Sequence, residues 1–247
     1  MTSHTIFDIK LGIEFTCKAR LVVDAKKVDT PPLMTYSSMV SRDFVWMVPM
    51  LVDLNDLDMN CTVIQNTYLN ENPKERVWFW SGKYFGVHNL SVGVVIRALY
   101  VLNGAGYAWV SSLRKPMRDL GFTPCRDDGD VWMRVSVDTS ELVSTTHYGL
   151  PVSEWYSECV LVYVDNLLVA SCIVYQLIQA ISNTYQLKKG KKNGIPYGPP
   201  KIYLGAHIHR HWEQEDDPEF FWYDISCDYY VNNMVANAQK KSMYHGI

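Results

Sequence analysis

The sequence is short of several features that mark whole classes of protein. No run of about 18 uninterrupted apolar residues occurs, so no spanning helix is expected. Residues 1–10 contain no apolar signal core, so secretion is not expected. The six cysteines form no CxxC pair, which disfavours a zinc ribbon. They predict reduced, mostly buried thiols in a cytoplasmic or nuclear protein.

Charge is also scarce, and its balance is slightly negative. Charged residues make up 20% of the 247, and the net charge is −3. That excludes a protein that coats nucleic acid by bulk positive charge, although a local basic groove remains compatible with it. Apolar residues make up 48%, which excludes wholesale disorder and suffices for a core.

Hydrophobic patterning predicts an α+β fold, with helices against one face of an antiparallel sheet. Two apolar runs flank Asp165 and Asn166, which is typical of a β-hairpin because Asx residues tolerate the positive φ of tight turns. Pro49 and Pro116 lie inside two expected helices and predict a kink or a break. Strands are expected at 19–24, 60–69, 92–99, 131–137 and 202–209, and helices at 41–55, 106–120, 174–185 and 228–240, with Ser41 as an N-cap and Gly121 as a helix end.

Five short blocks occur in an order that matches one family. They are KARLV at 18–22; TYSS at 35–38 with SRD at 41–43 and IQNTYL at 64–69; RALY at 97–100; DGDVW at 128–132; and YVDN at 163–166 followed by YLGA at 203–206. Together they resemble the reverse transcriptase of copia-type LTR retrotransposon polyproteins over roughly residues 8–240. The resemblance implies RNA-directed DNA polymerisation, with template-primer RNA or DNA and deoxynucleoside triphosphate as partners.

The family resemblance also implies a magnesium site, which this chain carries in degenerate form. Such polymerases hold two Mg²⁺ about 3.5–4 Å apart, on hard oxygen ligands. The family supplies three aspartates, and their positions fall on Val63, Asp165 and Asn166. Only Asp165 keeps its carboxylate, so metal binding should be weak and catalysis impaired. Asp58 is five residues from Val63, on the other face of a strand, and is not expected to replace the missing ligand.

Other positions match the substrate-binding parts of that family. Tyr68 falls where an aromatic ring lies beneath the incoming sugar and blocks a ribose 2′-hydroxyl; a half-buried tyrosine at a strand end is the plain alternative. Arg20 and Lys18 fall in the strand that meets the triphosphate, and an exposed basic strand is their plain alternative. Arg97 is equally compatible with structural pairing and substrate contact. Val101 replaces a glycine of the family pattern.

Three features lie outside the resemblance. His207, His209 and His211 alternate along an expected strand, so their side chains are predicted to lie on one face of it. They could bind a metal ion together, but an edge strand with polar residues facing outward is the favoured interpretation. Trp46, Trp78, Trp80, Trp109 and Trp132 are expected mainly in the core, although Trp78 and Trp80 share a strand face that could stack bases. The basic stretch at 188–193 reads as a solvated turn, or alternatively as a phosphate contact.

These observations lead to one expectation and one alternative. The fold expected is a right-hand polymerase: a single reverse transcriptase domain over 1–247, with fingers and palm at about 8–210, a palm sheet backed by helices, and the start of a thumb at 211–247. Protease, integrase and RNase H segments and membrane partners are not expected. The alternative is a non-catalytic nucleic-acid-binding or interaction protein that keeps the palm as a scaffold, with binding by Arg20, Lys18 and residues 188–192.

Overall fold

The computed structural model is a mixed α+β protein whose sheets are antiparallel throughout the described residues. It describes residues 3–10, 16–23, 39–55, 57–100, 102–135, 157–189, 197–204, 206–214 and 217–228, with some positions between 231 and 239. Two compact units are present. The first draws on residues 1–38 and 65–119, and the second on 39–64 and 120–247.

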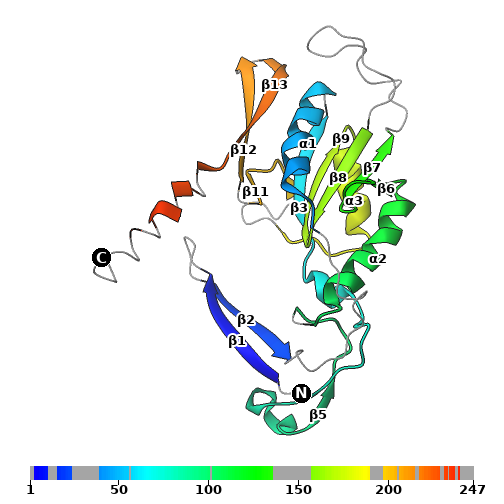
Figure 1. The fold of residues 1–247 in the computed structure, drawn as a ribbon, viewed down its shortest axis with the longest axis vertical. Helices are drawn as coiled ribbons and strands as arrows, with labels where there is room; N and C mark the ends of the chain where they lie inside the picture. Colours follow the sequence, from blue (N-terminus) through cyan, green and yellow to red (C-terminus); the bar gives the residue numbers. More distant parts are fainter. Residues whose placement is uncertain are drawn as a thin grey trace. The chain divides into compact units, whose positions relative to one another are not determined.

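The second unit is built on a six-stranded sheet (Figure 1). Its strand order is β10-β3-β9-β8-β7-β6, and each neighbouring pair is antiparallel. The strands are β3 (Asp58–Val63), β6 (Thr123–Pro124), β7 (Val131–Val135), β8 (Ser157–Tyr163), β9 (Asn166–Ser171) and β10 (Tyr197–Gly198). The hairpin predicted around Asp165 and Asn166 is therefore confirmed as β8 and β9.

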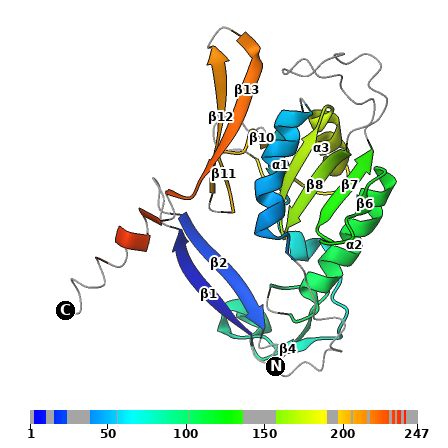
Figure 2. The same ribbon diagram turned by 45° about the horizontal axis from the view of Figure 1, so that its top comes forward.

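The two central strands are buried on both faces. Helix α1 (Arg42–Leu54) packs Val45, Val48 and Val52 into one core with Cys159 and Leu168 of the sheet. The alternate residues of β8 and β9 are equally buried, and helix α3 (Val174–Ser182) contacts β3 and β9 on that side (Figures 1 and 2). The expectation of helices on one face is wrong here. The unbroken apolar runs of β8 and β9, which do not alternate with polar residues, are the pattern of a doubly covered strand.

A smaller sheet completes the second unit. It comprises β11 (Ile202–Tyr203), β12 (Ala206–Gln214) and β13 (Asp217–Ser226), in that order. The predicted strand at 202–209 therefore divides between β11 and β12. Beyond it, the described positions from 228 to 239 are helical, as predicted for that segment.

The first unit holds two small ribbons and one long helix. β1 (Ser3–Lys10) pairs with β2 (Thr16–Val23), and β4 (Trp78–Trp80) pairs with β5 (Val92–Val94). Between and after them lie the 3₁₀ turns η3 (Thr67–Asn70) and η4 (Lys83–His88) and helix α2 (Ala105–Asp119). Its core contains Val23, Val77, Phe79, Val95, Ala98, Leu102 and Ala105. The strands expected over 60–69 and 92–99 end early, at Val63 and Val94.

Both proline-containing helices continue through their prolines. Pro49 lies inside α1 and Pro116 inside α2, so neither helix is broken at its proline, and the predicted kink stays a prediction. Ser41 is the N-cap of α1, but its side chain makes no capping bond; its backbone N–H donates instead to Asp128 Oδ2 at 2.8 Å. Gly121, with φ +83°, follows the end of α2, as the sequence predicts.

The structure also tests the expectation of buried cysteines and shows how the helices compare with a membrane-spanning one. All six cysteines are free thiols, but only Cys159 is buried, so the expectation of mostly buried thiols is wrong. Cys17 and Cys227 are exposed, and the other three are half-buried. None of the helices in the described part of the chain is long and apolar enough to cross a membrane.

Candidate functional site

The candidate site is the turn between β8 and β9. Tyr163 pairs with Asn166 across the hairpin, which leaves Val164 and Asp165 as a two-residue loop. Val164 has φ +55°, whereas the φ of Asp165 is not positive. A positive φ at the first loop residue alone is the type II′ pattern, which normally places glycine there. A β-branched residue in this conformation is strained, as backbone at functional turns often is.

The neighbouring strand β3 brings Val63 to the same place. Val63 is the direct cross-strand partner of Asn166, and the N–H of Ile64 donates to the carbonyl oxygen of Asp165 at 2.8 Å. Directly paired residues in an antiparallel sheet lie about 4.5–5.5 Å apart by Cα distance. The prediction that Val63 stands beside the hairpin turn is confirmed, although 102 positions separate it from Asp165 in the sequence.

Among the described residues, the side chains of this corner supply one carboxylate and one amide. Asp165 and Asn166 are half-buried, and Asn166 Nδ2 donates to Asp165 Oδ1 at 3.2 Å. Val63 adds an apolar wall. Two divalent ions carry four positive charges and need several oxygen ligands, which one carboxylate does not provide. In the described part of the chain, no cluster of three or more His, Cys, Asp or Glu residues has the arrangement of a metal site. The residues present therefore do not fit the two magnesium ions of the resembled family.

Asp58 does not repair the site. It stands at the opposite end of β3, where it pairs with Ser171, while Val63 pairs with Asn166. Its carboxylate instead lies 3.7 Å from Arg210 Nη1. This placement agrees with the expectation that Asp58 cannot replace the carboxylate missing at Val63.

A basic segment begins beside the same corner. Leu187 bridges to Ile64, and the N–H of Lys188 donates to the carbonyl oxygen of Val63 at 2.8 Å. The side chains of Lys188 and Lys189 are exposed. The rest of the 188–193 stretch lies outside the described residues. Positive charge therefore adjoins the turn, on the edge where β3 ends.

The predicted substrate-binding residues lie in the first unit. Tyr68 is half-buried in η3 and packs edge-on against Tyr100, with ring centroids 4.9 Å apart. Arg20 is exposed on β2, opposite Ile6, and the backbone of Lys18 pairs with that of Asp8. The Lys18 side chain lies outside what the structure describes, as do residues 35–38 and Val101. The roles of Tyr68, Arg20 and Lys18 toward a nucleotide stay predictions.

Arg97 and the histidine row have structural partners. Arg97 Nη1 donates to Asn70 O at 3.1 Å and to Asn72 Oδ1 at 3.4 Å, which supports structural pairing. His207, His209 and His211 do lie along one face of β12, with successive ring centroids 5.8 and 6.4 Å apart. His211 also faces Asp224, at 3.2 Å, and stacks on Trp222. The metal face considered for these histidines gains no support, because the described residues hold no such cluster.

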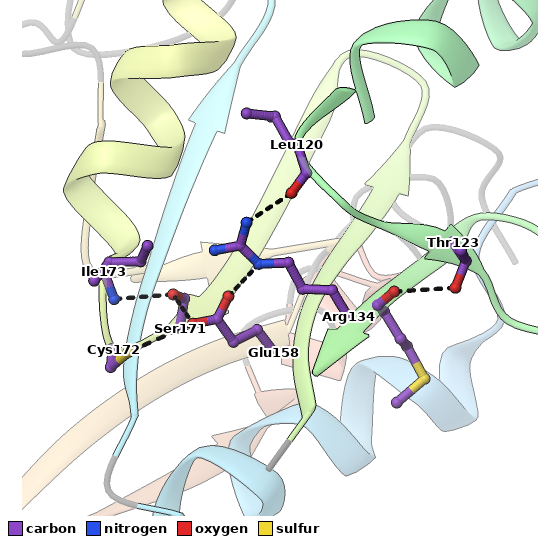
Figure 3. A network of polar contacts seen from close by, with 8 residues as sticks. Leu120, Thr123, Arg134, Glu158, Ser171, Cys172 and Ile173 are labelled. Carbon is purple, nitrogen blue, oxygen red and sulfur yellow. Dashed lines mark hydrogen bonds and ion pairs between the residues drawn. The ribbon is translucent and has the colours of Figure 1, made fainter. Parts of the chain in front are cut away.

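Sequence reasoning missed a buried charge network at the far end of the hairpin (Figure 3). Glu158, at the start of β8, is fully buried and accepts from Arg134 Nε at 2.5 Å and Ser171 Oγ at 2.9 Å. Arg134 Nη1 donates to Leu120 O at 2.6 Å, and the guanidinium lies 4.7 Å from the centroid of the Phe122 ring. The signal available in the sequence was an acid directly before an apolar run, because a carboxylate that becomes buried requires a partner.

The tryptophans divide between core and surface. Trp109 and Trp132 are buried, as expected, but Trp46, Trp78 and Trp80 are 44%, 50% and 54% exposed, so the expectation of core positions is wrong for these three. Trp78 and Trp80 do share one face of β4, as their spacing predicts.

Comparison of the chain with protein-family models, with curated proteins and with solved structures found no match.

Proposed function

We propose that this chain is a reverse-transcriptase-type fingers and palm from a copia-type retrotransposon polyprotein, followed by the start of a thumb, and that it has lost polymerase activity. The observation that carries the proposal is the pairing of Val63 with Asn166, next to Asp165 in the hairpin turn. The family needs three carboxylates that converge from two neighbouring strands. Here β3 and the β8–β9 turn bring Val63, Asp165 and Asn166 together, but two of these three side chains cannot bind a cation as a carboxylate does.

The chemistry explains why this loss should be severe. In nucleotidyl transfer, the metals activate the primer 3′-hydroxyl and stabilise the leaving pyrophosphate. Each ~1.4 kcal/mol of lost transition-state stabilisation slows the step about tenfold. Asn166 retains a carbonyl oxygen and is the milder change, whereas Val63 supplies no ligand atom. Asp165 alone would hold any remaining cation.

The test is primer extension by the purified chain on an RNA template with a DNA primer, Mg²⁺ and all four deoxynucleoside triphosphates. We expect no extension above a protein-free control. Extension that EDTA abolishes and that Asp165→Ala also abolishes would contradict the proposal. It would mean that another acid completes the site.

A second candidate function is non-catalytic binding of nucleic acid by the palm scaffold. The observation that favours it is the placement of Lys188, whose backbone is hydrogen bonded to Val63 and whose side chain is exposed beside Lys189. Lys188→Gln with Lys189→Gln should weaken binding of a primer–template duplex and reduce its salt dependence. Lys115→Gln, an exposed lysine of α2, is the matched control. Equal effects of the two changes would rule this function out.

A further inference from the structure

A groove lies between helix α1 and strand β13 of the second unit. The two elements contact each other within that unit (Figures 1 and 2). The groove has a volume of about 320 Å³, at the lower end of the range for small-molecule sites. Its lining consists of two aromatic rings, three apolar side chains and one carboxylate: Trp46, Tyr223, Pro49, Met50, Ile225 and Asp53. We call it the α1–β13 groove.

Helix α1 supplies one wall of the groove from a single face. Trp46, Pro49, Met50 and Asp53 follow the i, i+3, i+4, i+7 spacing of residues that share a helix face. The three buried valines of α1 lie on the adjacent face and pack into the core of the second unit. Trp46 and Met50 are still 44% and 56% exposed. Core packing therefore leaves much of both side chains open to a ligand.

Strand β13 supplies the opposite wall. Tyr223 and Ile225 are two positions apart, so their side chains leave the same face of the strand, and both pack against the core of the second unit. Trp222 and Asp224 project from the other face. There, Trp222 stacks on His211, and Asp224 Oδ2 lies 3.2 Å from His211 Nε2. The alternation of the strand thus gives the groove a tyrosine ring and keeps Trp222 outside it.

The charges around Tyr223 sum to a negative value. Arg210 is its cross-strand partner on β12, with the guanidinium 5.8 Å from the ring centroid. Arg210 Nη1 also lies 3.7 Å from Asp58 Oδ1. Burial raises the pKa of Tyr223 to about 12; the charge of Arg210 lowers it, and the charges of Asp58 and Asp53 raise it. Two carboxylates and one guanidinium therefore act on this phenol, which favours a cationic ligand.

We propose that the α1–β13 groove binds a trimethylammonium group, with Trp46 and Tyr223 as its aromatic walls and Asp53 as its counter-charge. The faces of tryptophan and tyrosine rings attract cations, and quaternary ammonium groups are recognised in this way. A primary ammonium brings three N–H donors, for which the apolar walls of the groove offer no side-chain acceptor. A trimethylammonium group has no donor to satisfy, and its methyl groups can be buried against those walls.

This inference goes beyond the proposed function. None of the six lining residues belongs to the corner formed by Val63, Asp165 and Asn166. The interaction needs no nucleotide, no template and no divalent ion. Binding is accordingly measured in EDTA, so that its result and the primer-extension result are independent of each other.

The experiment is an NMR titration of the full chain that follows the ligand signals of choline. The matched ligand control is the neutral tert-butyl analogue of choline, which has the same shape and no charge. We expect choline to bind, and the neutral analogue to bind about 2- to 30-fold more weakly. The amide of N-acetyl-trimethyllysine is a third ligand with the same head group. The tighter of choline and this derivative identifies the source of that group, a free small molecule or a modified protein side chain.

Matched variants make the result specific. Trp46→Ala should weaken choline binding by about 2- to 30-fold, and Trp46→Phe, which keeps a ring, by less. Trp222→Ala removes a tryptophan of nearly equal exposure, 45%, and should leave the affinity unchanged. Asp53→Asn should weaken the binding of choline but not that of the neutral analogue. Asp43→Asn, an exposed acid in the first turn of the same helix, should change neither.

Three outcomes would overturn the proposal, each in protein that keeps the wild-type circular dichroism and melting curve. The first is that neither choline nor the trimethyllysine derivative binds the wild-type chain. The second is equal affinity for choline and its neutral analogue, which would make the groove an apolar cleft without preference for charge. The third is an equal effect of Trp46→Ala and Trp222→Ala on choline binding, which would place the ligand outside the groove.

Discussion

Single residues decide what the hairpin corner can do. Asp165 keeps a carboxylate at the turn, while Val63 and Asn166 remove negative charge on both sides of it. The resemblance assigns each of these three positions to a ligand, and β3 and the β8–β9 turn bring them together. The turn also holds Val164 at φ +55°, a strained conformation for a β-branched residue.

At the opposite end of β8, a buried ion pair holds the sheet together. Arg134 and Glu158 are 11% and 0% exposed, so removal of one partner leaves a buried charge without compensation. Arg134→Met should lower the free energy of unfolding by about 3–5 kcal/mol in urea titration. Lys115→Met breaks the exposed pair with Asp119 and should cost less than about 0.5 kcal/mol.

A double variant distinguishes the effect of an uncompensated charge from a general folding defect. Arg134→Met with Glu158→Gln removes both charges and should recover part of the loss. If Arg134→Met alone were as stable as the wild-type chain, the pair would not be structural.

Secondary-structure elements were predictable from the sequence where neighbouring residues all favoured the same structure. The β8–β9 hairpin followed from two apolar runs around Asp165 and Asn166, although its loop is Val164 and Asp165 and the positive φ falls on Val164. Helix α2 followed from its expected end at Gly121, and α3 from helical spacing.

For the three-residue strands β4 and β5, the sequence predicted strand but not which face lies toward the core. Trp78 and Trp80 suggested a core, and only pairing of Phe79 with Gly93 across the ribbon fixes them outward. A strand of three residues carries too little alternation to reveal its inner face.

The continuity of α2 through Pro116 leads to a stability prediction. Proline at this position cannot donate to the carbonyl oxygen of Ser112, and it crowds that carbonyl. Pro116→Ala should therefore raise the free energy of unfolding by about 1–3 kcal/mol, as measured by urea titration. Pro49→Ala should raise the free energy of unfolding by less, because Pro49 is buried and removal of its ring leaves a void. A loss of stability at Pro116 would show that the helix depends on the ring.

At the scale of the whole molecule, the chain crosses between its two units. Residues 65–119 leave the second unit after β3, and the chain returns to it before β6. Val63 and Asp165 therefore meet through sheet register, across a long excursion. Local propensity cannot predict such a meeting. The family resemblance predicted this pairing, and without it the three positions would have seemed unrelated. Fingers, palm and thumb remain the proposed identities of these parts.

The second unit should lose stability at alkaline pH. Burial raises the pKa of Cys159 from 9.0 to about 12, with a smaller contribution from the charge of Glu158. Burial also raises the pKa of Tyr223 to about 12 and that of Tyr203 well above its usual value. These groups keep their protons in the folded state, while the unfolded chain releases them from about pH 9 for the thiol and pH 10 for the phenols. The stability that these groups contribute is fully present below about pH 9 for the thiol and about pH 10 for the phenols. It is lost as the pH rises toward the folded-state pKa.

The thiol contribution can be isolated by Cys159→Ala. Between pH 8 and pH 10.5, the wild-type chain should lose about 2 kcal/mol of unfolding free energy through Cys159 alone. The variant starts from a lower stability because of its cavity, but it should lose correspondingly less over this interval. Urea titrations at the two pH values measure the difference. An identical pH-dependent loss in both proteins would exclude the thiol as its source.

The most direct test of the central claim is calorimetric titration of the chain with Mn²⁺, used as a probe for the divalent-metal site. The wild-type chain should bind weakly, since Asp165 is the one carboxylate that the described residues bring to the corner. Val63→Asp with Asn166→Asp should bind at least about tenfold more tightly, while Val63→Asn, which adds no charge, should not. Tight binding of two Mn²⁺ by the wild-type chain, abolished by Asp165→Asn, would contradict the account. So would a folded Val63→Asp, Asn166→Asp variant that gains no affinity.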